Sequence, residues 1–173
     1  LRGGDAAVPL AVAEVVTPAP GVLRERFVPA EGVELACEWR LLADGLEVVL
    51  TCPRGGAAVE WASLPGSFAP DSGGLSLALP VMQGVLYDGR GDVFEDRLGY
   101  GGHAALSMAM LGYLAPGGGL LAANESVTDW WATVGRPAVG PPYAYVVQCA
   151  SLGSLDQARV LRLYPTDGDL TSL

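Results

Sequence analysis

The feature that most constrains the fold is an alternation of apolar and polar residues with a period of two. The segment Val33–Leu41 reads VELACEWRL, with an apolar side chain at every second position and Glu, Ala or Arg between. Successive side chains of a strand point to opposite faces, so this pattern predicts a half-buried strand. After Asp44-Gly45, a pair that suits a tight hairpin turn, the alternation resumes over Leu46–Cys52. We predict one core across this hairpin, formed by Trp39, Leu41, Leu46, Val48 and Leu50.

The same alternation, separated by turn-forming residues, recurs along the chain. With 24 Gly and 13 Pro among 173 residues, there is little room for long helices, and only Glu125–Val134 is expected to form a short helical turn. About ten short strands predict an all-β, antiparallel β-sandwich, as a single domain over residues 1–173. Besides the hairpin, the expected strands are Val8–Val16, Val59–Leu64, Leu75–Leu79, Met82–Tyr87, Leu106–Tyr113, Leu120–Asn124, Tyr143–Cys149 and Val160–Tyr164.

Charge and cysteine content exclude several classes of function. The formal net charge is −9, from 19 acidic and 10 basic residues, which argues against nucleic acid as a partner because phosphate contacts need a basic surface. No apolar run reaches the length of a membrane span, and no basic amphipathic segment suits a membrane surface. The three cysteines, Cys37, Cys52 and Cys149, form no CxxC pair and lie on apolar faces, so we expect buried free thiols.

A long polar segment, Asp88–Gly102, reads DGRGDVFEDRLGYGG and is predicted to be a loop. Long loops without regular structure are often functional. Its carboxylates do not have the spacing of an EF-hand, so we predict a solvated acidic loop and no metal site. His103, which follows the loop, is the single histidine of the chain, which excludes a site with several His ligands. No GxSxG motif is present to supply a nucleophilic serine, and no cofactor is expected.

The segment NESVTDWW brings Glu125 and Asp129 close in sequence to Trp130 and Trp131. A glycosidase needs two carboxyl groups roughly 5 to 9.5 Å apart across the sugar, and an exposed Trp can stack on a sugar ring. Neighbouring carboxylates in one loop more often face solvent, and two Trp are also ordinary core residues. We therefore interpret this segment as a strand end and turn, with no catalytic residues.

Three segments resemble a known family. They are LALPVMQGVLYDGRG (Leu77–Gly91), ALSMAMLGYLAPGGGLLAANESVTDWWATVG (Ala105–Gly135) and ARVLRLYPTDGDL (Ala158–Leu170). Their order resembles the N-terminal β-sandwich of multidomain glycoside hydrolases similar to endo-α-N-acetylgalactosaminidase. The resemblance implies a galactose-mutarotase-like supersandwich that precedes a catalytic (β/α)₈ barrel. Such a barrel needs about 250 further residues, so this chain would be a fragment without the catalytic pair.

The resemblance favours a non-catalytic accessory domain of a glycoside hydrolase that packs against a barrel of the same polypeptide and frames a carbohydrate. Two alternatives remain open. A stand-alone carbohydrate-binding module would show aromatic side chains in a line across one face. A mutarotase-like enzyme would need a His and a carboxylate across one sugar, which a single His makes harder to supply. The candidates for carbohydrate or domain contact are Gln83, Tyr87, His103, Glu125, Asp129, Trp130 and Trp131.

Overall fold

The computed structural model describes most of the chain, in several segments, and all structural statements concern these residues. They are residues 2–3, 6–7, 10–59, 61–68, 76–81, 84–88, 94–99, 107–126, 130–136, 145–150, 155 and 157–169. They form fifteen strands and one short 3₁₀ helix, η1 (Gly56–Ala58). Every strand pairing in the described part is antiparallel. The predicted all-β, sandwich-like class is therefore confirmed.

Nine strands make one long sheet with the order β3-β4-β5-β6-β15-β12-β11-β8-β9. We call it the long sheet. Its strands are β3 (Val12–Ala19), β4 (Val22–Ala30), β5 (Val33–Leu41), β6 (Leu46–Arg54), β15 (Arg159–Thr166), β12 (Gly118–Asn124), β11 (Met110–Ala115), β8 (Ser76–Leu79) and β9 (Val85–Asp88).

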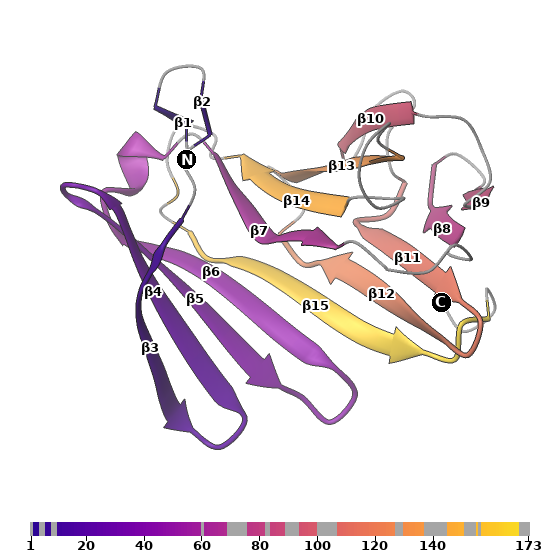
Figure 1. Cartoon of the computed structure of the whole chain (residues 1–173), viewed down its shortest axis with the longest axis horizontal. Coiled ribbons are helices and arrows are strands. Elements are labelled where there is room, and N and C mark those ends of the chain that lie inside the picture. Colours follow the sequence, from indigo (N-terminus) through magenta and orange to yellow (C-terminus); the bar gives the residue numbers. More distant parts are fainter. Residues whose placement is uncertain are drawn as a thin grey trace.

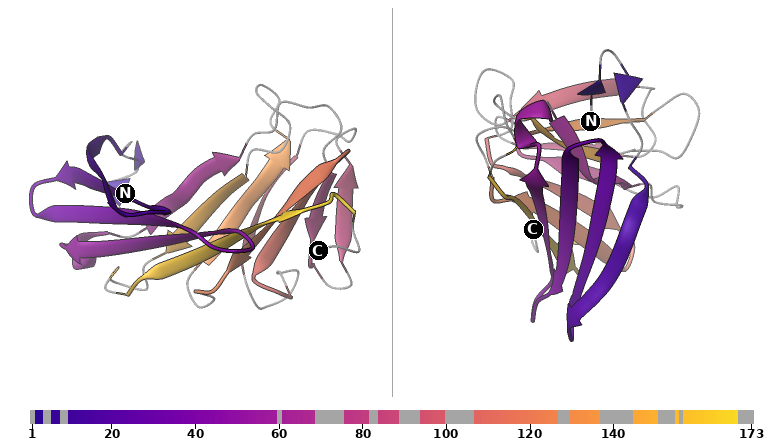
Figure 2. Two further views of the ribbon diagram at one scale, coloured as in Figure 1. Left: turned by 90° about the horizontal axis from the view of Figure 1, so that it is seen from below. Right: turned by 90° about the vertical axis from the view of Figure 1, so that its left-hand side faces the viewer.

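Four further strands make a second sheet, the short sheet, with the order β10-β13-β14-β7. They are β10 (Phe94–Gly99), β13 (Trp130–Arg136), β14 (Tyr145–Ala150) and β7 (Trp61–Phe68), while β1 (Arg2–Gly3) pairs separately with β2 (Ala6–Ala7). Figure 1 shows the short sheet over β15, β12 and β11, whereas β3, β4 and β5 extend beyond it. Figure 2 shows this projecting end of the long sheet from two further directions.

The core lies between the two sheets. It combines Leu35 of β5, Val48 of β6 and Leu161 of β15 with Ala62 of the short sheet, all 2% exposed or less. Val59 and Leu155 add to the same cluster, and the backbone N–H of Leu155 donates to the carbonyl of Gly56 at 3.0 Å. We call the face of the long sheet that carries these apolar side chains its inner face, and the opposite face its outer face.

The β5–β6 hairpin confirms most of the predicted core and corrects one residue. Val48 and Leu50 are buried, and Trp39 and Leu46 pack against the core. Leu41, however, is 72% exposed, so its predicted burial is wrong. The alternation identifies a face, but it does not say how far along the strand that face is covered. The turn is also longer than the Asp-Gly pair, because Leu41 pairs with Leu46 and the N–H of Leu42 donates to the carbonyl of Gly45 at 2.9 Å.

Besides the two-residue strands β1 and β2, three strands lie where none was predicted. Strand β4 carries the charged run Arg24-Glu25-Arg26, which hides its period of two. Strand β10 lies inside the predicted loop 88–102, at an edge of the short sheet, where a polar strand is well tolerated. Strand β13 replaces the second half of the predicted helical turn, since its β-formers Trp, Thr and Val pair with β10 and β14. Tertiary pairing decided all three cases.

The thiol prediction is confirmed for Cys37, which is buried and free. Burial raises the pKa of the Cys37 thiol to about 12, with a further contribution from the charge of Glu25. Cys52 is also a thiol but only half-buried, and its Sγ donates to the carbonyl of Arg54 at 3.2 Å. Cys149 belongs to β14, and its side chain lies outside the described part.

Candidate functional site

Several of the predicted contact residues lie where the structure gives no side-chain description. Gln83, His103 and Asp129 are outside the described residues. Trp130 and Trp131 begin strand β13, where they pair with Cys149 and Gln148 of β14. The structure therefore places these two Trp in the short sheet through their backbone.

Tyr87 and Glu125 are described, and they lie in different places. Tyr87 is on the edge strand β9, where it pairs with Leu77 and packs against the core. Glu125 follows β12, is exposed, and bonds through its Oε1 to Nη1 of Arg162 at 3.0 Å. Because β11 and β8 separate β12 from β9, the two residues are at least roughly 14 Å apart. A shared role for them in contacting carbohydrate stays a prediction.

Glu125 belongs instead to a row of alternating charges across the outer face, which we call the charge row. The strand register places Arg24 opposite Glu38, and it places Glu47 opposite both Arg40 and Arg162. Opposite charges at directly paired positions stabilise a sheet. In order across β4, β5, β6, β15 and the end of β12, the charge row consists of Arg24, Glu38, Arg40, Glu47, Arg162 and Glu125.

The contacts within the charge row are close. Glu38 accepts hydrogen bonds from Arg24 and from Arg40, the second at 2.6 Å. Arg40 Nη1 lies 2.9 Å from Glu47 Oε1, and Arg162 Nη2 lies 3.2 Å from Glu47 Oε2. A separate pair joins Arg26 to Glu14 at 2.9 Å. The charges of the row balance, so this face is suited to water rather than to attracting an ion of one sign.

The pairing shifts proton affinities toward the charged forms. Hydrogen bonds from Arg24 and then Arg40 lower the pKa of Glu38 below its usual 4.5. The pKa of Arg40 is raised by Glu38 and then by Glu47. The pKa of Arg162 is raised by a hydrogen bond with Tyr164 and then by Glu47. Such shifts keep each group ionised near neutral pH, which opposes a role in proton transfer.

We expect Glu38→Gln to lower the free energy of unfolding by about 1 kcal/mol at pH 7, since several exposed ion pairs are lost together. The folded-state pKa of Glu38 is depressed, so its stabilisation is present above pH 4.5 and is lost as the pH falls through the folded-state pKa. The difference between variant and parent should therefore shrink in acid. Urea denaturation at pH 7 and at successively lower pH measures it.

The matched control is Glu34→Gln, on the same strand and the same face. The register places Arg54 opposite Glu34, but Glu34 forms no ion pair among the described residues. This change should alter stability by no more than roughly 0.5 kcal/mol at either pH. Equal effects of the two substitutions at pH 7 would contradict a stabilising charge row.

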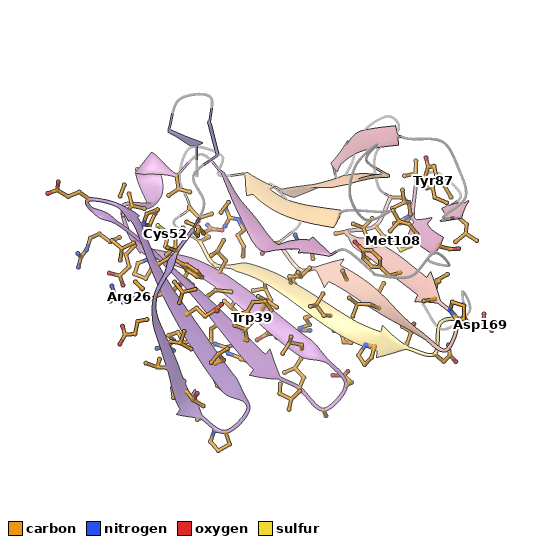
Figure 3. All side chains as sticks on the ribbon, in the orientation of Figure 1. Arg26, Trp39, Cys52, Tyr87, Met108 and Asp169 are labelled. Carbon is orange, nitrogen blue, oxygen red and sulfur yellow. The ribbon has the colours of Figure 1, made fainter. Side chains whose placement is uncertain are left out.

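A hollow of about 530 Å³ lies on the outer face over β3 to β6. Charged side chains, including Glu14, Arg26 and Glu34, form much of its wall, and none of the residues that line it is aromatic. Sugar rings usually stack on aromatic faces, so this hollow lacks a stacking platform. Figure 3 shows Arg26 at this end of the long sheet and Tyr87 at the other.

The described part of the chain was compared with the requirements of a metal site and of a membrane-spanning helix. No group of three or more His, Cys, Asp or Glu side chains there is placed to hold a metal ion. No helix there has the length and apolar character needed to cross a membrane.

The fold, an all-β sandwich with one long and one short antiparallel sheet, is shared with solved structures. No protein-family model matches the chain, and no curated protein matches it. A quadruple mutant of the alpha-N-acetylgalactosaminidase NagBb from Bifidobacterium bifidum matches 99% of this chain with a TM-score of 0.76 and 20% identity. The same enzyme in complex with GalNAc matches 93% with a TM-score of 0.73 and 19% identity.

These matches cover only part of the larger proteins. The chain spans 31% of the first NagBb chain and 28% of the second. At such low identity the likeness shows a common fold, and the fold is one that forms part of a glycosidase. The charge row was missed from the sequence, because only the polar face of Val33–Leu41 signalled it, and its partners depend on strand register.

Proposed function

We propose that the chain is an accessory β-sandwich domain of a glycoside hydrolase, of the galactose-mutarotase-like supersandwich type. In this proposal it precedes a catalytic barrel of the same polypeptide, packs against it and helps to frame a carbohydrate substrate. The observation that carries the proposal is the match of 99% of this chain to 31% of an alpha-N-acetylgalactosaminidase chain. The proposed substrate class is therefore an α-linked N-acetylgalactosaminide.

The chemistry of the described residues supports a non-catalytic role. Glycoside hydrolysis needs a carboxylic acid to protonate the leaving group and a second, ionised carboxyl group opposite. Of the two carboxylates Glu125 and Asp129, Glu125 is described, and its Oε1 forms an ion pair with Arg162 Nη1 at 3.0 Å. Glu38 and Glu47 are likewise held by Arg side chains. In this proposal these carboxylates have a structural role, as partners of Arg side chains on the outer face.

We expect this chain alone to release no nitrophenol from p-nitrophenyl α-N-acetylgalactosaminide, whereas the complete polypeptide that contains it should do so. The reason is that the acid and nucleophile belong to the proposed barrel. Robust turnover by this chain, abolished by Glu125→Gln, would overturn the proposal. If neither protein hydrolysed any aryl glycoside, the proposal that this chain belongs to a glycoside hydrolase would be contradicted.

The carbohydrate-framing part is tested separately by nuclear magnetic resonance titration of this chain with N-acetylgalactosamine, galactose and glucose. Chemical-shift changes at Tyr87, Trp130 and Trp131 are expected if these residues contact the sugar. Changes confined to β3 and β4 would place the sugar elsewhere and contradict the framing role of these residues.

A further inference from the structure

The inner face of the long sheet is covered over only part of its area. Along β5, exposure rises from 0% at Leu35 and 2% at Cys37 to 72% at Leu41, with Trp39 half-buried between them. The apolar alternation continues to the end of the strand although the cover does not. Figure 1 shows the reason, since the short sheet ends before β3, β4 and β5.

Apolar side chains of the neighbouring strands extend this uncovered area. The register places Leu23 of β4 opposite Trp39, and Val15 of β3 opposite Glu25. Leu23 is 38% exposed and Val15 is 54% exposed. Glu25 is the charged member of the group, and its Oε2 accepts a hydrogen bond from Trp39 Nε1 at 2.8 Å. We call this area the inner-face patch, formed by Val12, Val15, Leu23, Glu25, Trp39 and Leu41.

The outer and inner faces of the same strands differ in polarity. The outer face of β3 to β6 carries part of the charge row and the pair between Glu14 and Arg26. Its charged side chains are paired with one another and are stable in contact with water. The inner-face patch continues the apolar core instead. Contiguous exposed apolar area of this kind marks a site of interaction.

The geometry points to the inner-face patch as the docking surface for a second folded domain of the same polypeptide. This inference rests on the proposed function and assigns a face to the contact between domains. The domain that docks would present an apolar surface with a cationic or N–H donor opposite Glu25, because a carboxylate entering a dry interface needs a partner. In the matched structures this fold accounts for less than a third of a longer chain. The remainder of such a chain is the proposed source of the docking domain.

Charge opposes a second copy of the chain as the occupant. Each copy carries a net charge of −9, so two copies repel. A two-fold contact through this patch would also bring two Glu25 carboxylates into one apolar interface, where like charges are costly.

The test uses thiol labelling at two adjacent positions on opposite faces of one strand. Val15 is 54% exposed and Val16 is 41% exposed, but Val15 belongs to the inner-face patch and Val16 lines the hollow on the outer face. The Val15→Cys and Val16→Cys variants are made in this chain and in the complete polypeptide. Their reaction rates with a maleimide are corrected for the native cysteines by using each parent protein.

We expect both variants of this chain to react at similar rates. In the complete polypeptide, Val15→Cys should react about tenfold more slowly, because the docked domain covers the inner face. The rate of Val16→Cys, on the outer face, should be unchanged. Slowing of Val16→Cys alone would overturn the inference and move the contact to the outer face. Equal rates for the two variants in the complete polypeptide would show that no domain covers the inner-face patch and would overturn the inference.

Two controls keep the inference separate from the proposed function. Concentration-dependent slowing of Val15→Cys in this chain alone would identify a second copy as the occupant and overturn the inference. Hydrolysis by the complete polypeptide with an unprotected Val15→Cys would overturn the docking face while leaving the accessory-domain proposal intact.

Discussion

Leu35→Ala should lower the free energy of unfolding by about 3–4 kcal/mol, because removing a fully buried Leu side chain loses its apolar contacts and leaves a cavity. Leu35 is 0% exposed and belongs to the core cluster. Members of this cluster come from both sheets, so the site has little freedom to collapse. Urea denaturation followed by circular dichroism measures the loss as a lower midpoint without a change in slope.

The matched control is Leu41→Ala, at the end of the same strand and on the same inner face. Leu41 is 72% exposed in this chain, so its truncation should cost less than about 1 kcal/mol. A similar loss for the two variants would contradict the stepwise exposure along β5. It would mean that the isolated chain already covers the inner-face patch.

Gly55→Ala is expected to lower the free energy of unfolding by about 3–4 kcal/mol, combining a strained backbone with a steric clash. Gly55 has a φ of +76°, and an added Cβ would lie 2.5 Å from the carbonyl oxygen of Gly32. It would also approach the Cα of Val33 to 3.1 Å. Both contacts are with backbone atoms, one in the β4–β5 turn and one at the start of β5, so neither atom moves without disturbing the hairpin. Chemical denaturation again provides the measurement.

Gly32→Ala separates the two contributions. Gly32 has nearly the same φ of +77°, but an added Cβ there would meet nothing within 4 Å. Only the left-handed backbone is then penalised, at about 1 kcal/mol. The difference between the variants therefore estimates the clash at Gly55, and equal losses would show that the close approach of Gly55 to the β4–β5 turn is unimportant.

At the candidate site, local sequence shows the residue types, whereas distant contacts decide which of them come together. The segment NESVTDWW invited interpretation as a carbohydrate site because its residue types suit one. Only the sheet register shows that Glu125 ends a charge row whose members Glu47 and Arg162 are 115 positions apart in the chain. Such pairs are invisible to reasoning over short windows, because nothing local specifies which strands become neighbours.

By itself, the sequence determined that this chain forms antiparallel strands and which side chains of the β5–β6 hairpin share a face, because a period of two maps directly onto alternate faces of a strand. Tertiary structure decided the rest. It recruited the charged segments β4 and β10 as strands, because strand neighbours offer backbone hydrogen bonds that outweigh weak local preference. It also decided where the cover ends, leaving Leu35 buried and Leu41 exposed on one face, because burial depends on which distant strands lie above each residue.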